Sequence, residues 1–275
     1  MLKRFSVTSL VLVGAFCATP LAAFAGDEGD IGLRFENNKI VTTIVGDGPN
    51  PFGGDEERVF EGILGDLEGE GEDTAIFSPL PTSVTSTSSF VTNVPGFDTA
   101  EELFSNGSRV GIDITTPTLI TDSLMEFNGT GLVSTSVELQ ATFTIGSNTI
   151  LTRTDGDTNQ TDDSGILFLP AFSGAGGEQN EGRWHRHYVF ALYSDILSNG
   201  NLVEPATGVY VLELDVVTEE PGISDSDPIF IVFGVNADPD DAIEFVEANV
   251  VPEPTSALAL LAGAGLIATR RCRRA

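Results

Sequence analysis

The sequence predicts an all-β body between two short terminal segments of different character. Alternating or β-branched runs recur between residues 30 and 251, and helical periodicity is rare there. Stretches rich in Gly, Asn, Asp and Ser separate these runs at short intervals, as in folds built from consecutive hairpins. Together these features predict a single antiparallel β-sandwich or jelly-roll-like domain, with a signal helix before it and a short transmembrane helix after it.

The predicted strands follow one another along the body. The runs 31–35 and 39–45 flank the turn residues 36–38 and predict an early hairpin. Further strands are expected at residues 57–64, 110–114, 132–139, 141–145, 149–153, 186–193, 207–217 and 228–235. Two short helices are expected at residues 99–104 and 240–249, and the second begins among aspartates, whose negative charge favours a helix N-terminus.

The first 25 residues follow the pattern of a secretory signal peptide. Two bases and an apolar run precede small side chains at the positions that signal peptidase recognises. The residues that mark this cleavage site are Ala23, Ala25 and Gly26, with the cut expected before Gly26. We therefore expect the exported body to begin at residue 26.

The C-terminal segment combines a proline pair, an uncharged run and an arginine cluster. The residues that define it are Val251, Pro252, Glu253, Pro254, Arg270, Arg271, Arg273 and Arg274. The run from 256 to 269 is about 21 Å long as a helix, which is short for a hydrocarbon layer of about 30 Å. The arginines favour a cytoplasmic end. This segment therefore predicts a short transmembrane helix that stops transfer but anchors weakly.

This order of features resembles the PEP-CTERM sorting signal of exported bacterial proteins. The resemblance implies that an exosortase, a membrane-embedded transpeptidase, cuts the tail near the motif Pro252 to Pro254. The chain is then a substrate of that enzyme and of the secretion machinery, and its C-terminal helix lies in the inner membrane before processing. The product passes to the cell surface or extracellular matrix. The implied division is a signal peptide at 1–25, a body at 26–250 and a sorting signal at 251–275.

The body resembles a recurring body of planctomycete-type PEP-CTERM proteins. The segments that carry this resemblance are Asp30-Ile31, residues 94–98, His185-x-His187, residues 208–210, and Ser226-Asp227-Pro228 followed by residues 230–233. That group has no assigned activity, so the resemblance implies architecture and location only.

The charge of the body excludes one class of partner. Six of the 13 bases lie in the terminal segments, whereas all 41 acids lie in residues 26–254, which leaves a formal charge of −34 there. Such a surface repels nucleic acid and anionic lipid headgroups. It is compatible with cations, or with solubility alone. Both cysteines lie in the terminal segments, so the body has no thiol chemistry.

The chain contains two histidines, His185 and His187, at a spacing that places both on one face of a strand. Both imidazoles could then reach one metal ion. A cupin site would need a glutamate a few residues later and a third histidine, and the chain has neither. A site completed by carboxylates remains open. So does the alternative of ordinary strand-face histidines beside Trp184 and Tyr188.

An aspartate-rich loop is a candidate calcium site. Its oxygen-bearing residues are Asp155, Asp157, Asn159, Asp162 and Asp163. Calcium takes six to eight oxygen ligands, and this loop offers several within a few residues. The loop departs from the EF-hand because Gln160 replaces the required glycine and Ile166 replaces the bidentate glutamate. A plain polar turn is the alternative, and Ca²⁺ is the one candidate cofactor.

The sequence contains neither a nucleophile elbow nor a phosphate-binding glycine loop. We therefore expect a non-enzymatic structural or interaction role. One alternative is a module that binds exopolysaccharide through exposed aromatics such as Trp184 and Tyr188. A second is a metal-dependent enzyme that uses His185 and His187.

Overall fold

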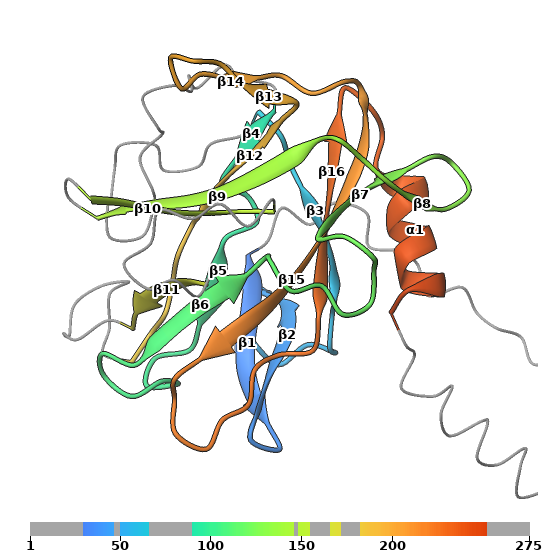
Figure 1. Cartoon of the computed structure of the whole chain (residues 1–275). Helices are drawn as coiled ribbons and strands as arrows, with labels where there is room; N and C mark the ends of the chain where they lie inside the picture. Colours follow the sequence, from blue (N-terminus) through green and yellow to red (C-terminus); the bar gives the residue numbers. More distant parts are fainter. Residues whose placement is uncertain are drawn as a thin grey trace, which may run out of the picture.

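The computed structural model describes residues 30–46, 50–65, 90–145, 148–154, 166–171 and 182–251 (Figure 1). The expected signal peptide, the calcium loop and the sorting signal after Val251 lie outside these residues. Within the described residues the fold is all-β with one helix, as the sequence predicts. None of the described helices is long and apolar enough to cross a membrane.

Sixteen strands precede the single described helix. They are β1 (Ile31–Glu36), β2 (Lys39–Ile44), β3 (Val59–Gly62), β4 (Val91–Thr92), β5 (Phe97–Thr99), β6 (Arg109–Asp113), β7 (Leu124–Phe127), β8 (Leu132–Ser134), β9 (Glu138–Ile145), β10 (Asn148–Arg153), β11 (Leu167–Pro170), β12 (Val189–Tyr193), β13 (Asp195–Ile196), β14 (Leu202–Val203), β15 (Gly208–Thr218) and β16 (Ile229–Val235). Helix α1 (Asp240–Asn249) follows.

The strands form four sheets. The largest has the order β11-β6-β15-β16-β3, with β7 and β8 joined to it through β15. The others are β10-β9-β12-β4, β2-β1-β5 and the pair β13-β14. Two ladders, β1 with β5 and β16 with β3, are parallel, so the prediction of purely antiparallel pairing is wrong there. Long connections separate these partners, and only a tight hairpin forces antiparallel pairing.

The early hairpin forms as expected. Strand β1 pairs with β2 from Ile31 opposite Ile44 to Glu36 opposite Lys39. Asn37 and Asn38 join the strands with φ angles of 52° and 63°. Asparagine tolerates this left-handed conformation better than most residues, and two consecutive positive φ angles suit the twist of a two-residue hairpin.

The hydrophobic core surrounds the two longest apolar strands. Figure 1 shows β15 and β16 side by side through the middle of the molecule, where they pair antiparallel. Their side chains are buried on both faces, which explains why these segments are nearly continuous hydrophobic runs. Helix α1 packs Ala242 and Val246 against the cluster that contains Val211 and Phe230.

Two local expectations need correction. Residues 99–104 are not a helix: Thr99 ends β5, and Glu102 has a φ of 61°, which no right-handed helix contains. Trp184 and Tyr188 are fully buried, with 0% exposure each, so they are not exposed aromatics. Both rings instead pack around Phe97 in the core. Buried aromatic rings of this size contribute a large apolar area to the core.

Candidate metal site

The start of β1 lies beside the start of β5. The Ile31 amide donates a 2.8 Å hydrogen bond to the Gly96 carbonyl, and Ile31 then pairs with Phe97 in the parallel ladder. Asp30, the residue before β1, is thereby held next to Gly96. The position of Asp30 depends on this β1–β5 pairing.

The histidine segment pairs with β5 from the other side. Phe97 and Arg186 exchange two backbone hydrogen bonds of 2.8 Å each. Because successive side chains of an extended segment alternate in direction, His185 and His187 lie on one face and Arg186 on the other. The Arg186 guanidinium donates to the Pro170 carbonyl at 2.7 Å. The Nε2 atoms of His185 and His187 lie 3.1 Å apart, which confirms the predicted common face.

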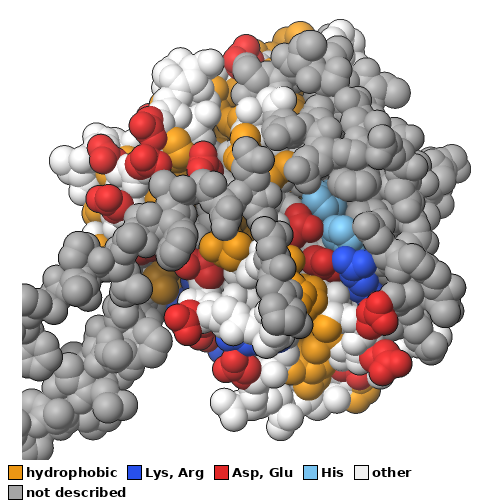
Figure 2. All heavy atoms as spheres, turned by 180° about the vertical axis from the view of Figure 1, so that it is seen from behind, with side chains coloured by type: hydrophobic (Ala, Val, Ile, Leu, Met, Phe, Trp, Pro, Cys, Tyr) orange, Lys and Arg blue, Asp and Glu red, His pale blue; other side chains and the backbone are white. Residues whose placement is uncertain are grey.

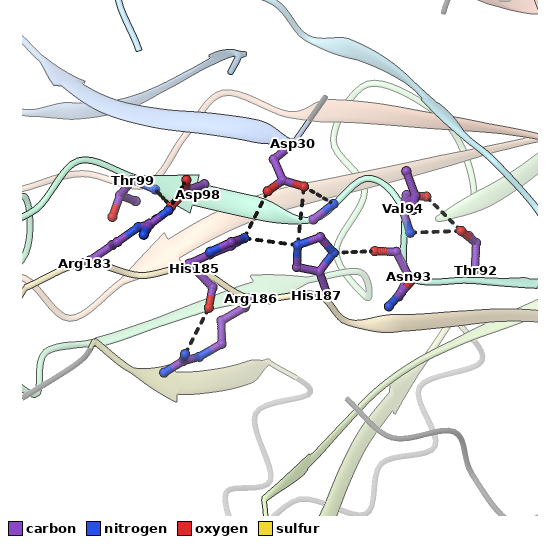
Figure 3. A network of polar contacts seen from close by, with 11 residues as sticks. Asp30, Thr92, Asn93, Val94, Asp98, Thr99, Arg183, His185, Arg186 and His187 are labelled. Carbon is purple, nitrogen blue, oxygen red and sulfur yellow. Dashed lines mark hydrogen bonds and ion pairs between the residues drawn. The ribbon is translucent and has the colours of Figure 1, made fainter. Parts of the chain in front are cut away.

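The three side chains converge at one point (Figure 3). The His185 Nε2 atom lies 3.1 Å from Asp30 Oδ2 and 3.1 Å from His187 Nε2. The His187 Nε2 atom lies 3.5 Å from Asp30 Oδ1. Asp30, His185 and His187 thus form a group of three side chains whose donor atoms are close enough together to hold one metal ion. Among the carboxylate, imidazole and thiol groups of the described residues, these three meet that condition.

The far nitrogen of His187 fixes its protonation pattern. His187 Nδ1 lies 3.1 Å from the Asn93 carbonyl oxygen. A carbonyl only accepts, so Nδ1 carries the hydrogen, and in the neutral imidazole the Nε2 lone pair points at Asp30 and His185. His185 Nδ1 is buried and has no hydrogen-bond partner among the described residues.

Asp30 is ionised in this setting. Burial alone raises the pKa of its carboxyl, but hydrogen bonds and positive charge from His185 and His187 outweigh burial and hold the pKa well below its usual range. The Gly96 amide also donates to Asp30 Oδ1 at 3.1 Å. The cluster therefore contains one carboxylate charge beside the Nε2 atoms of His185 and His187.

Gly96 makes the close approach possible. A Cβ atom at this position would lie 2.5 Å from His187 Cε1 and Nε2, and 2.7 Å from Asp30 Oδ1. Carbon atoms without a bond between them normally stay at least about 3.5 Å apart. Only glycine, which has no Cβ atom, lets the backbone at residue 96 lie this close to the His187 ring and the Asp30 carboxylate.

The cluster reaches the surface on one side. The His187 side chain is 2% exposed, whereas His185 is 11% and Asp30 is 19% exposed. Figure 2 shows the two histidines on that face beside acidic side chains. The Asp30 and His185 side chains are thus the partly exposed edge of the cluster, and His187 is its buried side.

A charged pair braces the segment next to the cluster. Arg183 donates to both carboxylate oxygens of Asp98, through Nε at 2.8 Å and a terminal nitrogen at 2.6 Å. The backbone amide of Trp184 donates to Thr99 Oγ1 at 2.8 Å. These contacts hold the chain before His185 against β5.

Sequence analysis found the histidines but missed their carboxylate. Asp30 lies 155 residues from His185 and is one of 41 acids, and no spacing rule singles it out. Ala191 and Leu192, which lie a few residues after the histidines where a cupin site would have its glutamate, are fully buried core residues of β12. The signal that bears on Asp30 is its place directly before a predicted strand.

The other candidate residues fall outside the described part of the chain. These are the cleavage residues Ala23, Ala25 and Gly26, the calcium-loop residues Asp155, Asp157, Asn159, Asp162 and Asp163, and the sorting residues after Val251. Val251 itself follows α1, and its amide donates to the Val246 carbonyl at 3.0 Å.

Comparison of the chain with protein-family models, with curated proteins and with solved structures finds no match.

Proposed function

We propose that this chain is an exported cell-surface or extracellular-matrix protein, processed by an exosortase at its C-terminal signal. Its body has a structural or interaction role and not a catalytic one. The observation that carries this proposal is the combination of Pro252, Glu253 and Pro254 with the uncharged run 256–269 and the terminal arginine cluster. No single one of these features has comparable specificity.

The arrangement of the body is compatible with trimming at both ends. Every described strand and the helix lie between Ile31 and Asn249. Cleavage before Gly26 and near Pro252 therefore removes none of them. Before trimming, the tail would hold the protein at the inner membrane through its short apolar helix.

We infer that the sheets pack as one β-sandwich or jelly-roll-like domain. The support is a single large hydrophobic cluster that joins three of the sheets, with Leu33 from β1, Phe190 from β12 and Leu212 from β15 among its members. A shared core of this kind favours one domain over two.

The two alternatives now differ in support. Exopolysaccharide binding loses Trp184 and Tyr188 as contact residues because both are buried, so it would need other side chains. A metal-dependent enzyme at His185 and His187 gains a third ligand from Asp30. Neither alternative conflicts with export.

Mass spectrometry of the protein from the producing cells tests the proposal. We expect a surface or secreted form that begins at Gly26 and ends near Pro254, with partners limited to the secretion machinery and exosortase during transit. The variant Glu253→Ala should retain its tail and stay in the membrane fraction, whereas Glu247→Ala, in α1, should be processed normally. Intact chain in the cytosol, with both termini still present, would contradict the proposal.

A further inference from the structure

We propose that Asp30, His185 and His187 form a binding site for one divalent transition-metal ion of the zinc class. This site is independent of the proposed sorting, because its residues all lie in the body. It also differs from the calcium loop, whose candidate ligands are all oxygens.

The separations between the donor atoms match the edges of a coordination polyhedron. Zinc takes imidazole nitrogen and carboxylate oxygen at about 2.1 Å, and two ligands that subtend 90–109° at the ion then lie about 3.0–3.4 Å apart. His185 Nε2 lies 3.1 Å from His187 Nε2 and 3.1 Å from Asp30 Oδ2, and His187 Nε2 lies 3.5 Å from the other carboxylate oxygen, Asp30 Oδ1. One ligand atom from each of the three residues can be chosen so that all lie within 4.8 Å of one another. An ion can sit among these atoms with little movement of the side chains.

The donor types select the class of ion. Two imidazoles and one carboxylate suit Zn²⁺, Fe²⁺, Co²⁺, Ni²⁺ and Cu²⁺, whereas Ca²⁺ and Mg²⁺ prefer oxygen ligands alone. No described thiol contributes, because both cysteines lie in the terminal segments. We therefore expect zinc-class ions to bind here and calcium not to compete.

With both rings neutral, the facing acceptors of the cluster need a cation between them, either a metal ion or a proton. His187 Nε2 lacks a hydrogen in the neutral ring, since Nδ1 donates to Asn93, and it faces the Asp30 carboxylate. In a neutral cluster His185 has one Nε2–H to donate, to either Asp30 or His187. His187 Nε2 and Asp30 Oδ1 then still face each other at 3.5 Å with no hydrogen between them. A divalent ion binds all three donors. The competing arrangement, in which a proton on His187 replaces the ion, is an outcome of the test below.

Neighbouring groups hold two of the ligands in place. The Asn93 carbonyl orients the His187 ring, as carbonyl and carboxylate acceptors do for metal-bound histidines generally. The Gly96 amide holds Asp30 Oδ1. Both ligands are therefore positioned before an ion arrives, which lowers the entropic cost of binding.

The three ligands from the described residues leave room in the coordination shell for at least one more ligand. Structural zinc sites have four protein ligands, whereas the described part of the chain supplies three here, from Asp30, His185 and His187. The partly exposed edge at Asp30 and His185 gives a water or another small ligand access to the ion. The ion would also tie the N-terminal strand to a segment 155 residues away, so binding should stabilise the fold.

Metal titration of the purified full chain, stripped by a chelator, tests the site. We expect one Zn²⁺ per chain by elemental analysis after desalting, and a rise in Tm of about 5–10 °C at 100-fold excess over Kd. Co²⁺ should bind at the same site and quench the fluorescence of Trp184, the chain's one tryptophan, which adjoins His185. Excess Ca²⁺ should neither displace the Zn²⁺ nor change the quenching of Trp184 fluorescence by Co²⁺.

Variants separate this site from the acidic surface. Asp30→Asn and His187→Ala should lower Zn²⁺ affinity at least tenfold and abolish the Co²⁺ signal. Asp241→Asn removes an exposed carboxylate in α1 and should bind as the parent does. His185→Gln provides a second test if His187→Ala fails to fold. The proposal is overturned if the parent and the folded ligand variants bind Zn²⁺ with equal stoichiometry and affinity. It is also overturned if the parent binds no Zn²⁺, which is the result expected if a proton on His187 takes the place of the ion.

Discussion

The substitution Gly96→Ala tests the packing at the cluster most directly. The added methyl group would lie 2.5 Å from two atoms of the His187 ring and 2.7 Å from Asp30 Oδ1. Normal contact distances are about 1 Å longer. The His187 side chain is 2% exposed, and its Nδ1–H donates a hydrogen bond to the Asn93 carbonyl oxygen, so the ring has little room to move.

The expected loss of stability follows from this overlap. Forcing an extra methyl into a packed site typically costs about 1–3 kcal/mol in the free energy of unfolding. For a body of this size each kcal/mol lowers Tm by about 2–4 °C. We therefore expect Gly96→Ala to lower Tm by about 2–12 °C and to weaken metal binding, because Asp30 and His187 must separate.

Gly131→Ala is a matched control. A Cβ atom there has its nearest neighbour, Phe245 Cζ, at 3.9 Å, which is an ordinary contact. Both substitutions restrict the unfolded chain by a similar amount, so their difference isolates the overlap. Urea unfolding monitored by Trp184 fluorescence gives both free energies. If Gly96→Ala is as stable as Gly131→Ala, the close approach of Gly96, Asp30 and His187 is not a feature of the folded protein.

Two further predictions concern charged groups outside the cluster. Asp98→Ala should lower the free energy of unfolding by about 2–4 kcal/mol, because it leaves the largely buried Arg183 guanidinium without its carboxylate. In urea unfolding, a double variant that adds Arg183→Met should recover part of this loss. If it recovers none, the two side chains are not energetically coupled. Burial, with the negative charges of Glu213 and Asp113, raises the pKa of Asp215 to about 6. The folded state therefore binds this proton more tightly than the unfolded chain, and stability falls as pH rises from about 4 to about 6. Asp215→Asn should remove this pH-dependent loss of stability. At pH 7.5 its free energy of unfolding should exceed that of the parent by about 1 kcal/mol, after allowance for solvent screening of this partly exposed group. The gain should shrink at pH 4.5, and an equal gain at both pH values would contradict this explanation.

The sequence predicted the strands that carry a strong local signal. The hairpin of β1 and β2, the long apolar strands β15 and β16, and helix α1 lie close to where alternation, β-branched runs and aspartates at a helix start indicate them. Short strands such as β7 and β11 were missed, because a few residues carry too little periodicity to distinguish them from loops.

The sequence by itself also determined that His185 and His187 share one face, since a spacing of two residues on extended chain requires it. Tertiary structure alone decided which third ligand joins them and how close a backbone can pass beneath them. Asp30 and Gly96 reach the histidines only because β5 pairs with β1 on one side and with the histidine segment on the other. Pairing between segments so far apart depends on the whole core, and no local pattern in the chain encodes it.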